Sequence, residues 1–201
     1  MFTGGLLLVF LTLVLGNLAF ARLADHAAVA AGVLWISFAF AGTLTLSRSL
    51  HRERDRGTWE ALALLPIDWG IVYLVKVAAN VFVLLLIEAI ALPLYALLFD
   101  TDLLEPLLKL LPILILGTIG LAASGTFLAA LSSHGRSREI LLPLLLFPLL
   151  VPLLMMAIQG TEKAIAGLPS SDFVAEHVLL LAFDAIFLAI GWLTFDYVLS
   201  E

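Results

Sequence analysis

Six long apolar runs divide this sequence, and together they present more apolar surface than a soluble domain of this length can bury. Each run is close to the roughly 20 residues that a helix needs to cross the hydrocarbon core of a bilayer. The runs cover residues 4–21, 29–50, 70–99, 107–131, 139–159 and 174–199. Only 13% of the residues are charged, about half the share found in soluble domains. The chain is therefore predicted to be an all-α integral membrane protein with six transmembrane helices.

The connections between the runs are short, so residues 1–201 are predicted to form a single transmembrane domain. The chain has no cysteine, which excludes disulfides, thiolate metal sites and cysteine nucleophiles. No two of its four histidines share a metal-ligand spacing, and the sequence has no phosphate-binding glycine loop. We therefore expect no catalytic residue, no metal site and no nucleic-acid partner, and the surrounding lipid bilayer is the first partner of such a chain.

Basic residues are unevenly shared between the two sets of connections. Six arginines lie around the connections that follow the second and fourth runs: Arg48, Arg52, Arg54, Arg56, Arg136 and Arg138. The opposite connections hold Arg22, Lys109 and Lys163 together with seven acidic residues. Because cytoplasmic loops are enriched in Lys and Arg, the arginine-rich side and both termini are predicted to be cytoplasmic. No basic residue precedes the first run, which favours a retained helix over a cleaved signal peptide.

The longest polar stretch of the chain covers residues 51–66. Thr58 follows a glycine and suits the N-cap of a short helix, because its hydroxyl can accept from a free first-turn amide. Trp59 and Pro66 are seven residues apart and fall on one face, and the proline ends the helix. Asp68 is placed to cap the next span. This short helix either rests passively among lipid headgroups or docks a cytosolic partner.

Two carboxylates fall inside predicted spans, Glu88 near the middle of the third and Asp184 in the last. A charged carboxylate at the centre of a bilayer costs about 2.5–3.5 kcal/mol on insertion scales, so such residues face the bundle interior or water. Two interpretations stay open for both residues. Each carboxylate is functional, carrying protons or contacting a substrate, or it is simply protonated or hydrogen-bonded to a neighbouring helix.

Small residues and prolines mark two neighbouring spans. Gly117, Gly120 and Ser124 share one face of the fourth span, and small residues at this spacing let helices approach closely, within the subunit or across a dimer. The fifth span contains three prolines, Pro143, Pro148 and Pro152. Each removes a backbone donor and crowds the preceding turn, so this span is predicted to be kinked.

The polar stretch resembles the cytoplasmic signature of ABC-2-type transporter permeases. It reads Glu53-Arg-Asp-Arg-Gly-Thr-Trp-Glu-Ala-Leu62, with Pro66 and Lys76 following. The resemblance implies a coupling helix within residues 51–68 that rests in a groove on a cytosolic ATPase. The residues that it implicates in this coupling are Arg52, Glu53, Arg54, Asp55, Gly57, Thr58, Trp59, Glu60, Leu62 and Pro66.

Three further segments resemble the CcmB family, the haem exporter permease of cytochrome c maturation. They are Leu116–Gly120, Ser137–Pro143 and Phe147–Pro152, and the likeness covers the chain from about residue 29 onward. Members of that family usually begin with a basic amphipathic segment, whereas this sequence opens directly on an apolar run. The departure raises the expectation that the native N-terminus is longer.

The resemblance implies a subunit of a bacterial inner-membrane complex with a CcmA-like ATPase and with CcmC-like and CcmD-like membrane partners. Such a complex serves c-type cytochrome biogenesis, by haem export or by ATP-driven release of a haem-loaded chaperone. Haem is then a handled ligand, ATP hydrolysis belongs to the partner, and two copies of the chain supply the two membrane halves. The alternatives are a generic ABC-2 exporter of a drug, lipid or glycan and, more distantly, an intramembrane enzyme or proton channel built on Glu88.

Overall fold

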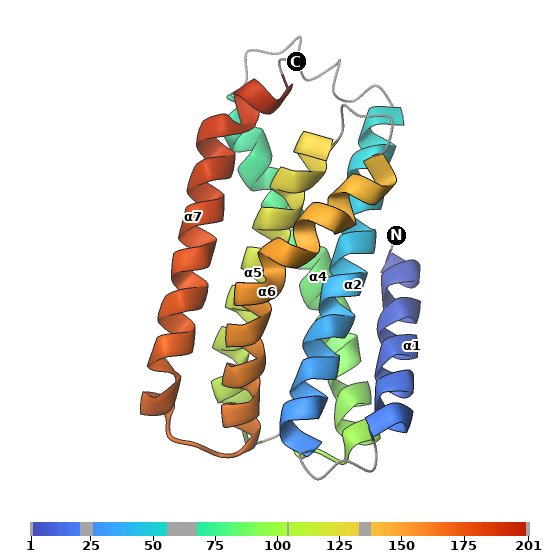
Figure 1. Ribbon diagram of the computed structural model, residues 1–201, viewed down its shortest axis with the longest axis vertical. Helices are drawn as coiled ribbons and strands as arrows, with labels where there is room; N and C mark the ends of the chain where they lie inside the picture. The colour runs from blue at the N-terminus through green and yellow to red at the C-terminus, as the bar shows by residue number, and fades with distance from the viewer. Residues whose placement is uncertain (1, 21–25, 56–67, 104, 133–137, 200–201) are drawn as a thin grey trace.

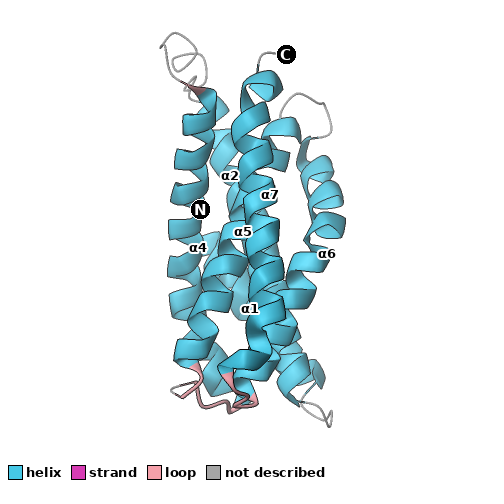
Figure 2. Ribbon diagram, turned by 90° about the vertical axis from the view of Figure 1, so that its left-hand side faces the viewer, coloured by secondary structure: helices cyan, strands magenta, loops and turns pink. Residues whose placement is uncertain are grey.

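The computed structural model describes residues 2–20, 26–55, 68–103, 105–132 and 138–199. Within these ranges the chain is helical and contains no strand (Figure 2). The elements are α1 (Phe2–Phe20), α2 (His26–Asp55), α4 (Trp69–Phe99), α5 (Leu107–Leu131), α6 (Arg138–Ile165), the 3-10 turn η2 (Ser170–Phe173) and α7 (Val174–Leu199). Six of the helices are long and apolar enough to cross a membrane. The predicted six-helix, all-α membrane architecture is confirmed.

The helices run side by side along the long axis of the molecule (Figures 1 and 2). The α4–α5 and α6–α7 connections lie at one end, which we call the acidic end because Asp100, Asp102, Glu105 and Asp172 are exposed there. The C-terminal end of α7 lies at the opposite end. Helix α1 has 19 residues and α4 has 31, lengths of about 28 Å and about 46 Å at 1.5 Å per residue. The N-terminus therefore begins part-way along the bundle.

Helix α5 forms the axis of the bundle and packs against α2, α4, α6 and α7. Every residue from Gly120 to Thr126 is buried, because helices cover this helix all round. Helix α1 lies at the margin, in contact with α2 and α4, and its apolar side chains Leu7, Leu11 and Leu18 are exposed. In a bilayer that outer face lies against lipid, so the exposed leucines need no protein partner.

Glycines let the neighbouring helices approach α5 closely. A Cβ at Gly117 would lie 2.1 Å from the Trp35 ring of α2, and one at Gly125 would lie 2.3 Å from Leu46. The Trp35 indole is fully buried and donates to the Thr161 hydroxyl of α6 at 2.8 Å. The small-residue face predicted from the sequence is thus a packing surface within the subunit.

Two helix boundaries differ from those predicted. Helix α2 continues to Asp55 rather than ending near residue 50, because the Leu-His-Arg-Glu-Arg stretch consists mostly of good helix formers. Helix α6 continues to Ile165 rather than residue 159, and ends before Gly167, whose positive φ of 74° suits glycine.

The predicted cap at Asp68 is confirmed, since its carboxylate accepts from the Gly70 amide at 2.8 Å. Helix α6 also bends along its length (Figure 1), as its three prolines predict.

The contact between Gly117 and Trp35 yields a stability prediction. We expect Gly117→Ala to destabilise the bundle by about 1–3 kcal/mol, the usual cost of overpacking a filled core. The added methyl would displace the Trp35 indole and break its hydrogen bond to Thr161. Thermal unfolding in detergent, followed by tryptophan fluorescence, measures the effect. Gly32→Ala is the matched control, because no atom lies within 4 Å of its added Cβ. Equal stability of the two variants would refute the packing described here.

Candidate functional site

Three polar side chains of α4 bond to α5 inside the bundle. The Asn80 amide donates to the Thr126 hydroxyl at 2.9 Å. The Tyr73 hydroxyl lies 3.1 Å from the Ala123 carbonyl of α5 and 3.0 Å from the Phe187 carbonyl of α7. A single phenolic hydrogen thus serves two helices, and the same ring packs against Phe195 of α7. These bonds hold α4, α5 and α7 together where no water is available to replace them.

Glu88 completes the row of polar contacts between α4 and α5. Its side chain is buried, and its Oε1 accepts from the Thr118 hydroxyl at 2.5 Å. The other oxygen, Oε2, is buried and has no hydrogen-bond partner. The sequence predicted a residue that faces the bundle interior, and this placement is confirmed. The role of the carboxyl stays a prediction.

Asp184 approaches α5 from α7. It is buried, and neither carboxylate oxygen has a hydrogen-bond partner. On α5 it meets Gly120, two residues beyond the Thr118 that contacts Glu88. Two residues of an α-helix correspond to about 200° of rotation and about 3 Å of rise. The two carboxyls therefore meet nearly opposite faces of α5 at almost the same depth, and they form two separate sites.

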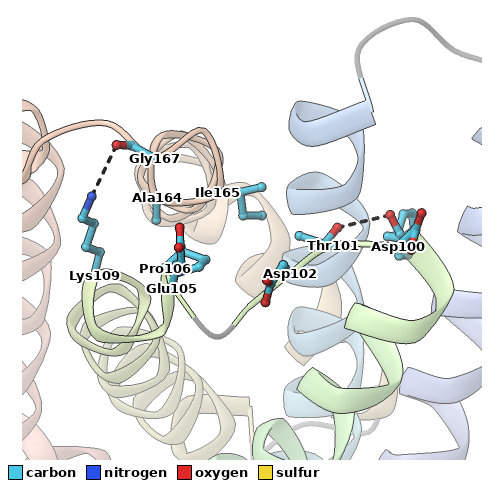
Figure 3. A pocket seen from close by; sticks show the side chains of 10 residues that line it. Asp100, Thr101, Asp102, Glu105, Pro106, Lys109, Ala164, Ile165 and Gly167 are labelled. Carbon is cyan, nitrogen blue, oxygen red and sulfur yellow. Dashed lines mark hydrogen bonds between the residues drawn. The ribbon is translucent and has the colours of Figure 1, made fainter.

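A cavity of about 500 Å³ opens at the acidic end, between the α4–α5 connection and the last turn of α6 (Figure 3). Its polar lining includes Asp100, Asp102, Glu105 and Lys109, and the apolar part comes from Phe99, Pro106, Ala164 and Ile165. Among the described residues, no group of three or more His, Asp or Glu side chains is placed to hold a metal ion. The cavity was not predicted, because its walls come from segments about 60 residues apart in the sequence.

Two lysines fasten the α6–α7 connection at the acidic end. The Lys109 ammonium donates to the Leu168 carbonyl at 2.8 Å and also reaches the Gly167 carbonyl (Figure 3). The Lys163 ammonium donates to the Asp172 carbonyl at 2.9 Å and pairs with the buried Glu176 at 2.6 Å. Both basic residues thus have a structural role in closing this end of the bundle.

The implicated coupling residues fall into two groups. Arg52, Glu53, Arg54 and Asp55 form the final turn of α2, where the structure describes the backbone. The other six lie outside the described residues: Gly57, Thr58, Trp59, Glu60, Leu62 and Pro66. Helix α2 therefore includes the first charged residues that the resemblance implicates in coupling, and Asp68 caps α4 after the undescribed residues.

Sequence reasoning missed the hydroxyl partner of Glu88 and the role of Tyr73 and Asn80. Asn80 carried a signal, because an amide in a long apolar run is costly unless it is bonded. Thr118 and Thr126 gave no such signal in the sequence, because the hydroxyl of a threonine in a span commonly bonds to a carbonyl of its own helix. Ser37 and Thr43 of α2 bond within their own helix in this way, since each hydroxyl donates to the backbone carbonyl four residues back.

Comparison with known proteins shows the family of the chain. The sequence profile of the family described as "CcmB protein" matches residues 2–199. This chain belongs to the CcmB family. The match includes all six helices and both termini of the bundle, so the architecture described above is that of a CcmB-type membrane protein.

Three bacterial relatives, each named "Heme exporter protein B", resemble the chain. The protein of Rhodobacter capsulatus is 34% identical over 143 residues, which cover 71% of this chain and 65% of the relative. That of Pseudomonas aeruginosa is 30% identical over 75% of the chain and 66% of the relative. That of Paracoccus denitrificans is 29% identical over 81% and 73%. The chain thus matches about two thirds of the length of these relatives.

The Lys163–Glu176 pair yields a second stability prediction. We expect Lys163→Met to destabilise the protein by about 1–3 kcal/mol, because it leaves the buried Glu176 carboxylate without its charged donor. The thermal unfolding midpoint in detergent measures the loss. The double variant Lys163→Met/Glu176→Gln removes the buried charge as well and should recover most of it. A single variant as stable as the wild type would show that the pair does not fasten the α6–α7 connection.

Proposed function

We propose that this protein is the membrane subunit of an ABC transporter complex required for c-type cytochrome biogenesis. The family match over residues 2–199 carries the proposal, together with relatives that bear the name haem exporter protein B. Haem is the handled ligand, either exported or released on a loaded chaperone by ATP-driven motion. The complex lies in the bacterial inner membrane, with CcmC-like and CcmD-like membrane partners.

ATP hydrolysis belongs to a separate cytosolic subunit of the CcmA-like type. The sequence has no phosphate-binding glycine loop of its own, so the energy for movement must reach the bundle through a contact. An ABC transporter needs two membrane halves, and one chain supplies one of them. A homodimer of this chain provides both.

The coupling contact is the segment between α2 and α4. Helix α2 remains helical to Asp55 and α4 begins at Trp69, so a push on the intervening residues acts directly on two long helices. Helix α4 in turn bonds to α5 and α7 through Tyr73, Asn80 and Glu88. In this account the arginine-rich end of the bundle faces the cytoplasm, with both termini on that side.

Variants in the coupling segment test the proposal. We expect Trp59→Ala and Glu60→Ala to reduce co-purification of the CcmA-like ATPase at least several-fold and to lower the level of c-type cytochromes. Both residues lie in the polar stretch between the second and third apolar runs of the sequence, so insertion and helix content should be unchanged. Pull-down of the tagged chain from its native membrane, with haem staining of c-type cytochromes, makes the measurement.

Asp172→Ala is the matched control, because this exposed carboxylate lies at the acidic end and accepts a hydrogen bond from the neighbouring Ser171. It should retain both the ATPase and the cytochromes. Normal assembly and normal cytochrome levels in both coupling variants would refute the coupling role. A different outcome is loss of the ATPase in the coupling variants while c-type cytochromes stay at the normal level. If deletion of the whole chain also leaves the cytochromes at the normal level, the results favour a generic ABC-2 exporter of a drug, lipid or glycan.

A further inference from the structure

Asp184 occupies a space that a glycine leaves open. A Cβ built on Gly120 of α5 would lie 2.6 Å from the Asp184 Oδ1 and 2.2 Å from Leu153 of α6. The aspartate is 4% exposed, and both of its oxygens lack a hydrogen-bond partner. The carboxyl is therefore enclosed where α5, α6 and α7 meet, with the backbone of α5 directly against it.

Among the described side chains, no cationic group bonds to either oxygen of this carboxyl. Helix α5 has no ionisable residue after Lys109, and the described side chains of α6 have none before Glu162. On α7 the ionisable neighbours are Glu176 and His177, about two turns away, and the exposed Asp196, more than three turns away. None of these residues lies next to the carboxyl. Glu176 pairs with Lys163 instead, and the His177 ring nitrogen lies 2.7 Å from the Phe173 carbonyl.

Two ionisable residues of α4, Tyr73 and Glu88, are bonded to other groups. The Tyr73 hydroxyl is engaged by the Ala123 and Phe187 carbonyls, and Glu88 meets α5 at Thr118, on nearly the opposite face. Lys76 lies one turn from Tyr73 on α4 and is partly exposed. Both Asp184 oxygens remain without a partner even with this lysine present.

An ionised carboxylate without a partner costs far more to bury than a neutral acid, so burial favours the form that holds a proton. We propose that Asp184 is a proton-binding site in the seam between α5 and α7, and that its proton is released only when α7 moves away from Gly120. In the closed seam the carboxyl is neutral. In a parted seam water reaches the carboxyl, which ionises, so the movement of α7 against α5 is linked to a proton.

The contrast with Glu88 distinguishes this site from an ordinary buried acid. Glu88 has a hydroxyl partner, which supports its carboxyl in either protonation state. Asp184 has none, and its fit depends on a missing side chain at Gly120. The proton linkage does not rest on the proposed ATPase coupling, and it would apply to any movement that separates these two helices.

Infrared spectroscopy of the wild-type protein in lipid bilayers tests the proposal directly. Aspartate labelled with ¹³C in its carboxyl separates these signals from those of Glu88 and the other glutamates. Asp184 is the buried aspartate among the described residues, and Asp68, Asp100, Asp102, Asp172 and Asp196 are exposed. At neutral pH we expect one labelled band of a carboxylic acid carbonyl, which Asp184→Asn removes. Labelled aspartate signals of carboxylates alone would overturn the proposal, whether or not the variant folds.

A second measurement tests the link to helix packing. Raising the pH removes the proton more readily from the parted state than from the closed one, so the wild type should lose stability as the pH rises above about 4, the ordinary pKa of aspartate in water. For one proton the unfolding constant changes by up to about tenfold per pH unit. Asp184→Asn, neutral and of the same shape, should lose this part of the pH dependence, whereas Glu88→Gln should retain it. Identical pH dependence in the wild type and Asp184→Asn would refute the linkage.

Discussion

Inside a bilayer no water can bond to polar groups, and α5 supplies the partners of three polar side chains of α4. The helix offers hydroxyls at Thr118 and Thr126 and a backbone carbonyl at Ala123, and α4 bonds to each of them. Its glycines let Trp35 of α2 and the carboxyl of α7 approach the backbone. Because α5 is covered by four helices, a displacement of any one of them changes contacts that water cannot replace. The position of α5 therefore sets the relation among all the helices around it.

The two ends of the bundle are built differently, and the difference suits a transporter subunit driven from one side. At the acidic end, Lys109 and Lys163 fasten the α6–α7 connection by bonds to carbonyls and to Glu176. At the other end α2 and α4 extend as long helices, joined by the segment that we propose contacts the ATPase. A force applied there is carried by α4 to its polar contacts with α5 and α7. In the proposed mechanism, the lysine bonds hold the acidic end together, and the movement separates α7 from α5 beside Asp184.

The architecture was largely readable from the sequence, because length and hydropathy alone dictate a spanning helix. The inward placement of Glu88 and Asp184 followed from the cost of exposing a carboxyl to lipid. The helix ends at Asp55 and Ile165 were not readable, since charged helix formers continue a helix past the membrane without an apolar signal. The partners were also beyond reach: whether Thr118 bonds its own turn or Glu88 depends on which helix lies beside it. The cavity at the acidic end could not be predicted either, because its walls come together only after the helices have packed.

The central claim is that the middle of α5, from Gly120 to Thr126, is enclosed by the surrounding helices and is bonded by polar groups of its neighbours. A photoactivated diazirine dissolved in the bilayer tests this without altering the protein, because the carbene it forms reacts with any side chain that lipid reaches. Adducts located by mass spectrometry should appear on lipid-facing residues such as Leu7 of α1, Leu97 of α4 and Leu193 of α7. Residues 120–126 of α5 should remain unmodified. Labelling of that stretch at the level seen on α1 would contradict the account.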